Sequence, residues 1–194
     1  TALGGGDGPG QGPAYFPAHR GKQQAFALFE FLLRLQAEGQ AYLRPALARY
    51  AAAATQPGPL ILISDLLDTT PGAPDLPVDR SRPWADGLNA LAARGFEVTV
   101  LHVLAPDEVD PGAAPWLAAG PGRDFRLLDS ESGADVEITA DPDLLERYRR
   151  GVAAWQEEIR RFCGARGMHY VPVGTSTSIE ELLFAWLRHR GVLK

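Results

Sequence analysis

The chain has 194 residues, of which 45% are hydrophobic, and it contains one cysteine. This length suits one globular domain that buries an adequate core without disulfides. Its 19 Lys and Arg residues against 24 Asp and Glu residues give a formal charge of −5, which argues against a nucleic-acid surface. A single cysteine excludes an internal disulfide, and no apolar stretch is as long as a membrane span. We therefore expect a cytoplasmic location, although a longer parent protein can still be membrane-anchored.

The first 20 residues differ in composition from the rest of the chain. Residues 1–20 are rich in glycine and proline and contain little that could pack. Such a segment cannot offset its ordering entropy, so we expect it to be flexible and the domain to comprise residues 21–194. Helices are predicted over 22–38, with a stripe of apolar side chains facing inward, and over 42–54.

The most informative segment is an apolar run that stops at a carboxylate. Leu60-Ile61-Leu62-Ile63, followed by Ser64 and Asp65, predicts a strand that is buried on both faces. A helix at 84–93 and a second strand at 96–104 complete a βαβ unit, so the two strands should be parallel. Asp65 would then lie at the carboxyl end of its strand, where open α/β sheets bind ligands. Aspartate also starts turns, and the spacing alone favours that simpler role.

The second half of the chain predicts a hairpin, a long helix, a third parallel strand and a final helix. Strands at 125–128 and 136–139 flank a turn rich in Asp, Ser and Gly. Asp141 and Pro142 open the longest helix, whose apolar side chains recur at alternating spacings of three and four. A strand follows at 168–173, and a Ser-x-x-Glu capping box opens the last helix. The predicted fold class is therefore α/β: a mostly parallel sheet flanked by helices, with an inserted β-hairpin.

Several of these segments together resemble the C-terminal part of the bacterial domain-of-unknown-function-58 family, which carries a divergent von Willebrand factor A-type domain. The matching segments lie between about residue 19 and the C-terminus and comprise 60–65, 95–108, 128–133, 148–162 and 179–187. The sequence Leu-Asp-Ser-Glu-Ser-Gly at 128–133 is the most family-specific of them. The resemblance implies a von Willebrand factor A- or Rossmann-like sheet.

The chain departs from this family at the metal site. A typical von Willebrand factor A domain opens with a strand ending in Asp-x-Ser-x-Ser, which supplies most of a Mg²⁺ site, and this motif is absent from the sequence. The family's Gly-Gly-Thr-Asp-Leu segment corresponds to 39–43, so that Ala41 stands where the ligand threonine would be. Only Ser64 and Asp65 remain of the usual set. A lone aspartate rarely holds Mg²⁺, so we expect no tight metal site unless a partner or a further segment completes it.

The resemblance implies a non-enzymatic interaction or adaptor module that works with a MoxR-type AAA+ ATPase in the assembly or maturation of complexes. Its expected docking surface comprises Asp65, Asp107 and Glu108, although a solvated loop is the simpler interpretation of the last two. The alternative is a metal-dependent hydrolase or phosphoryl-transfer enzyme that uses Asp65 and Asp68, with Thr69 as a weak candidate for a further oxygen ligand. Under the first hypothesis no residue is catalytic.

The absent first strand has a structural consequence. In the family's sheet that strand would lie beside 60–63, so its absence leaves 60–63 as an edge with exposed backbone groups. Such an edge favours pairing with a partner strand or with a second copy of the chain. A self-contained alternative is that the hairpin or the N-terminal segment covers it.

Other reactive side chains have simpler interpretations. Cys163 lies near the apolar stripe of the long helix and is expected to be a buried small hydrophobe. His102 and His169 lie in strands without metal-ligand spacing and are expected to be hydrogen-bonded structural histidines. Asp129 and Glu131 flank a glycine-containing turn, where they are expected to cap the hairpin and face solvent.

Overall fold

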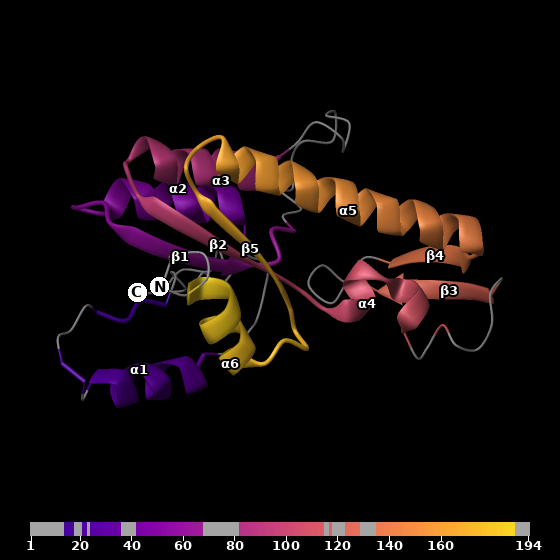
Figure 1. The fold of residues 1–194 in the computed structure, drawn as a ribbon, viewed down its shortest axis with the longest axis horizontal. Helices are drawn as coiled ribbons and strands as arrows, with labels where there is room; N and C mark the ends of the chain where they lie inside the picture. Colours follow the sequence, from indigo (N-terminus) through magenta and orange to yellow (C-terminus); the bar gives the residue numbers. More distant parts are fainter. Residues whose placement is uncertain are drawn as a thin grey trace.

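A computed structural model describes most of the chain, and Figure 1 shows its ribbon. The described residues are 14–17, 21–22, 24–35, 42–67, 82–114, 117, 123–128 and 135–188. Their strands form a three-stranded parallel sheet in the order β1-β2-β5 and a separate antiparallel hairpin, β3-β4. The predicted α/β fold class, with helices flanking a parallel sheet and an added hairpin, is therefore confirmed. This arrangement is consistent with a von Willebrand factor A- or Rossmann-like fold.

The parallel sheet contains the three strands predicted from the sequence. They are β1 (Pro59–Ser64), β2 (Glu97–Leu104) and β5 (His169–Gly174). Helix α3 (Pro83–Ala93) connects β1 to β2, which makes the predicted βαβ unit. In the sheet register Leu62 pairs with Val100, and Val100 pairs with Tyr170. Because all three residues point to the same face, this row of side chains supports the packing of helices above it.

The main core lies between one face of this sheet and three helices. Figure 1 shows these helices together on one side of the sheet. These are α2 (Leu43–Ala53), α3 and α5 (Pro142–Gly164). Buried side chains of the helices and the sheet meet in a single cluster that includes Leu47, Leu88, Val100, Ile159 and Tyr170. Burial of this apolar surface, at about 25 cal/mol per Å², is the main source of stability.

The opposite face of the sheet is only partly covered. Leu101 and Val171 are buried there against Leu182, whereas Ile61 and Ile63 of β1 are 56% and 68% exposed. Only Leu62 of the β1 isoleucine-leucine run is buried. The prediction that this strand is buried on both faces is therefore wrong. The reason is that α2, α3 and α5 cover the Leu62 side, and Leu182 reaches only β2 and β5.

The first helix differs from its prediction in length and environment. It begins at Gln24 and ends at Leu33 (α1), within the predicted 22–38, and none of its side chains is buried. Phe26 is 74% exposed and Leu33 is 85% exposed. In Figure 1, α1 lies on the other side of the sheet from α2, α3 and α5. The predicted inward stripe is therefore wrong, because the helix does not lie against the core. Residues 1–13 and 18–20, for which we expected flexibility, lie outside the described residues.

The last helix begins as predicted but changes its geometry after one turn. The Ser178 hydroxyl accepts a hydrogen bond from the Glu181 amide at 3.1 Å, which is the expected N-terminal cap. One α-helical turn, α6 (Ile179–Glu181), leads into a π-helical segment, η2 (Leu182–Leu187). Ile179, at the start of this helix, is 61% exposed. In the described part of the chain, every helix is too short or too polar to cross a membrane.

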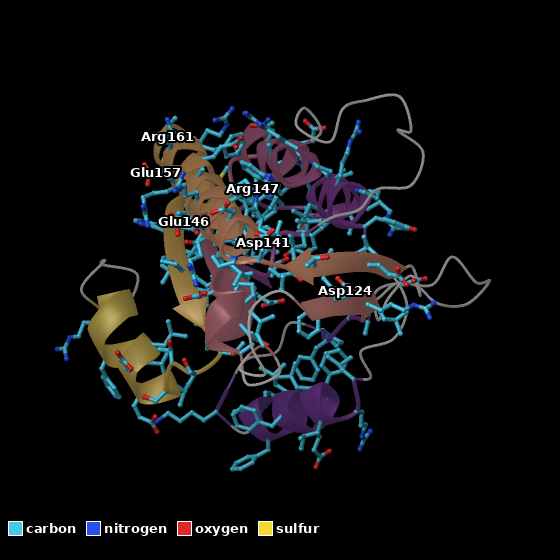
Figure 2. The ribbon with its side chains drawn as sticks, turned by 90° about the vertical axis from the view of Figure 1, so that its right-hand side faces the viewer. Asp124, Asp141, Glu146, Arg147, Glu157 and Arg161 are labelled. Carbon is cyan, nitrogen blue, oxygen red and sulfur yellow. The ribbon has the colours of Figure 1, made fainter. Side chains whose placement is uncertain are left out.

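The hairpin extends away from the parallel sheet, beside the N-terminal half of α5 (Figure 1). Its elements, with the short helices near them, are β3 (Arg123–Leu128), β4 (Asp135–Ala140), α4 (Pro106–Val109) and η1 (Pro111–Ala113). Asp124, labelled in Figure 2, accepts a hydrogen bond from the Thr139 hydroxyl at 2.6 Å on its polar face. Asp141 caps α5, because its carboxylate accepts a hydrogen bond from the Leu144 amide at 2.7 Å. The hairpin and the Asp141 cap were predicted from the turn and cap residues, whereas the bond between Asp124 and Thr139 was not.

Candidate interaction site at the carboxyl end of the sheet

The turn after β1 is fixed by its own two polar side chains. The Ser64 hydroxyl accepts a hydrogen bond from the Leu66 amide at 3.0 Å, and the Asp65 carboxylate accepts one from the Leu67 amide at 3.1 Å. These bonds hold Leu66 at a φ of 57°, a left-handed conformation that is rare for leucine. Burial of the Leu66 side chain in the core compensates for that strain. The Ser64 and Asp65 side chains therefore organise the turn, as the simpler interpretation predicted.

A buried histidine ties this turn to the neighbouring strands. His102 of β2 is only 1% exposed. Its Nε2 lies 2.9 Å from the backbone carbonyl oxygen of Asp65, and its Nδ1 lies 2.8 Å from the Tyr170 hydroxyl oxygen. The Trp155 ring of α5 meets the imidazole edge to face, with ring centres 4.8 Å apart. One imidazole thus joins β1, β2, β5 and α5.

The partners of His102 define its tautomer. A carbonyl oxygen can only accept, so Nε2 carries the hydrogen and donates it to Asp65. Nδ1 is then the acceptor, and the Tyr170 hydroxyl donates to it. Burial lowers the pKa of His102, against the opposing effects of the Asp65 carbonyl and of the charges of Asp65 and Glu108. Burial also raises the pKa of Tyr170 to about 12. Both rings are therefore neutral around pH 7.

This histidine gives the folded state a specific pH dependence. In the unfolded chain a histidine has a pKa of about 6.5, whereas burial in the fold lowers the pKa of His102. The unfolded state therefore binds the proton more readily, so stability is fully present above about pH 6.5 and is lost as the pH falls below it. The expected loss is at most about 1.4 kcal/mol per pH unit.

Urea unfolding of wild type and of His102→Gln between pH 7.5 and 5.5 measures this effect. We expect the loss of stability to be smaller in His102→Gln than in wild type. An identical slope in wild type and His102→Gln would contradict the assignment.

The acidic residues after β2 belong to α4 and its turn. The Glu108 carboxylate accepts a hydrogen bond from the Ala105 amide at 2.5 Å, which fixes it at the start of α4. Asp110 forms an ion pair with Arg149 of α5 at 2.7 Å, and this bond lowers the pKa of Asp110. The Tyr148 hydroxyl donates to the Glu108 carbonyl at 2.7 Å. This segment is thus docked on α5 rather than being a free solvated loop.

The structure brings the three residues of the predicted docking surface to one end of the sheet. Asp65 follows β1 and Glu108 follows β2, and the charges of both act on His102. Burial raises the pKa of Tyr148, and the charges of Glu108 and Asp107 raise it further. All three carboxylates are exposed. Whether a partner binds this surface remains a prediction.

Sequence reasoning missed several residues that build this end of the sheet. Tyr170, Trp155, Tyr148 and Arg149 were not singled out, because each acts through a partner distant in sequence. One signal in the sequence could have indicated this network: Tyr170 lies in a strand predicted to be buried, and a buried tyrosine hydroxyl needs a hydrogen-bond partner. His102 was the obvious candidate for that partner.

The remaining candidates have other environments. Cys163 is buried, and its burial raises the pKa of the thiol to about 11, so it is the inert residue that was predicted. His169 is exposed, and its interpretation as a hydrogen-bonded structural histidine stays a prediction. Asp68, Thr69, Asp129 and Glu131 lie outside the described residues. Within the described ranges there is no cluster of three His, Cys, Asp or Glu side chains that could hold a metal ion.

Comparison with known proteins found no matching family model, no matching curated protein and no matching solved structure. The resemblance to the domain-of-unknown-function-58 family therefore remains a prediction from the quoted segments.

Proposed function

We propose that this chain is a non-enzymatic interaction module whose docking surface lies at the carboxyl ends of β1 and β2. The observation that supports it best is the placement of three exposed carboxylates, Asp65, Asp107 and Glu108, on neighbouring strand ends. Backbone amides hold the Asp65 and Glu108 carboxylates in position. None of the three forms an ion pair within the described residues, whereas nearby Asp110 is neutralised by Arg149. The surface therefore keeps its negative charge.

A fixed negative surface of this kind suits a basic partner surface. Exposed charges at an interface mainly accelerate association and select partners, and salt screens their effect. The buried network around His102 keeps the turn rigid, so little ordering entropy is lost on binding. The resemblance implies that the partner is a MoxR-type AAA+ ATPase and that the module serves the assembly or maturation of other complexes.

Charge removal at this surface tests the proposal. We expect Asp107→Asn combined with Glu108→Gln to weaken binding of a purified MoxR-type ATPase about three- to tenfold, mainly through slower association. Biolayer interferometry at low and high salt measures this change, and the difference between variant and wild type should shrink at high salt. Glutamine at 108 keeps an oxygen that can accept the Ala105 amide bond.

The matched control is Glu97→Gln, which removes an exposed charge at the other end of β2. This control should bind like wild type. Equal weakening in the control would indicate a nonspecific charge effect, and wild-type affinity in the double variant would place the docking surface elsewhere. Failure of the wild-type chain to bind would contradict the proposed partner.

A further inference from the structure

The outer edge of β1 presents backbone groups that have no partner in the described part of the chain. Among the described strands, β1 pairs with β2 alone. The Gly58 carbonyl accepts a hydrogen bond from the Glu97 amide of β2 at 3.1 Å. Backbone groups alternate between the two sides of a strand. Those of Leu60 and Leu62 therefore face β2, as the Gly58 carbonyl does, and those of Ile61 and Ile63 face away from it. No described residue bonds to them.

The side chains along this edge lack the features that protect an edge strand. Edge strands of monomeric proteins usually carry charges, prolines or bulges along their length. β1 has one proline, at its first residue, and none of its six residues is charged. After Pro59, its exposed side chains are Ile61 and Ile63, which are both β-branched and lie on the same face of the sheet. This edge therefore has the composition of a strand inside a sheet.

The sequence of β1 is self-complementary in the antiparallel direction. A two-fold axis at Leu62 places Ile61 opposite the second copy's Ile63, and Ile63 opposite the second copy's Ile61. Both belong to the residues whose backbone groups face outward, so each pair can exchange two hydrogen bonds. We infer that β1 pairs antiparallel with β1 of a second copy of this chain, with Leu62 at the axis.

Charge selects this orientation over the parallel one. Parallel pairing in register would bring the Asp65 carboxylates of the two copies side by side, and like charges opposite each other destabilise a sheet. Antiparallel pairing places each Asp65 beside the second copy's Pro59, at opposite ends of the interface. The contact is isologous and closes after two copies, so it gives a dimer rather than a filament. One continuous sheet then runs through both copies. This inference does not depend on the acidic docking surface.

The mass of the full chain in solution tests the inference. Multi-angle light scattering and sedimentation, from micromolar to submillimolar concentration, should show a rise from 20.9 kDa to twice that mass. Ile63→Lys should remain at 20.9 kDa throughout, because a lysine on the edge blocks pairing. Leu128→Lys is the matched control, because Leu128 on the hairpin is also 68% exposed, and this variant should dimerise like wild type.

Amide hydrogen exchange tests the register. The Ile61 and Ile63 amides should gain about tenfold or more protection as the concentration rises, while the Leu62 amide, which faces β2, is protected at every concentration. A chain that is monomeric throughout overturns the inference. So does a dimer that survives Ile63→Lys or leaves the Ile61 amide unprotected. These outcomes are independent of ATPase binding by the acidic surface, so the two proposals fail separately.

Discussion

Replacing His102 with alanine is expected to lower the free energy of unfolding by about 3 kcal/mol. The change removes the two hydrogen bonds of His102, the one that it donates to the Asp65 carbonyl and the one that it accepts from the Tyr170 hydroxyl. A buried polar group left without a partner costs about 1–3 kcal/mol. The edge contact with Trp155 is lost as well, at about 0.5–1.5 kcal/mol. Urea denaturation followed by far-ultraviolet circular dichroism measures the change.

Two further variants distinguish the loss of the hydrogen bond between His102 and Tyr170 from a general destabilising effect of substitution. Tyr170→Phe removes one donor and is expected to cost about 1–2 kcal/mol. Its effect should not add to that of His102→Ala, because both changes delete the same bond. His169→Ala alters an exposed side chain and should change stability by less than about 0.5 kcal/mol. Additive effects of the first two substitutions would contradict the shared hydrogen bond.

Gly87→Val is expected to destabilise the fold by about 2 kcal/mol. Helices α2 and α3 approach so closely here that a β-carbon on Gly87 would lie 2.9 Å from Leu47 Cδ1 and 3.3 Å from Leu47 Cβ. Neither helix can move away without opening the core, in which Leu47 and Leu88 are buried. Overpacking of this kind costs about 1–3 kcal/mol.

Gly151→Ala is expected to change stability in the opposite direction to Gly87→Val. Gly151 lies in the middle of α5, and a β-carbon there meets no atom within 4 Å. Because alanine is the better helix former, this variant should be more stable than wild type by about 0.5–1 kcal/mol. Thermal unfolding of both variants gives the two signs directly. A stabilised Gly87→Val variant would show that α2 and α3 do not pack as described.

Most elements could be predicted because their signals are local. The apolar run before Ser64 and the stripe along α5 specify a strand and a helix through periods that neighbouring residues alone define. Asp141 caps its own helix, and its bond to Leu144 spans three residues. The parallel order of β1 and β2 followed from the helix between them. For these features, the interactions that stabilise the structure lie within a few residues of each other.

The features that sequence reasoning missed depend on distant residues. His102 and Tyr170 are 68 positions apart, so no pattern around either one reveals their bond. An apolar stripe indicates that a helix packs against another apolar surface, but it does not identify that surface. In this structure α1 has no buried side chain. The same is true of Ile61 and Ile63, whose composition suits burial although their face of β1 is open. The left-handed Leu66 was missed because leucine carries no turn signal.

The length of α5 has a mechanical consequence. Its 23 residues form one uninterrupted rod of about 34 Å. The C-terminal half is anchored in the core through Ile159 and Cys163, and the N-terminal half is clamped to α4 by Tyr148 and Arg149. Trp155 lies between these two attachments and touches His102. A force applied at the α4 end is therefore transmitted along a stiff lever to the interior of the sheet.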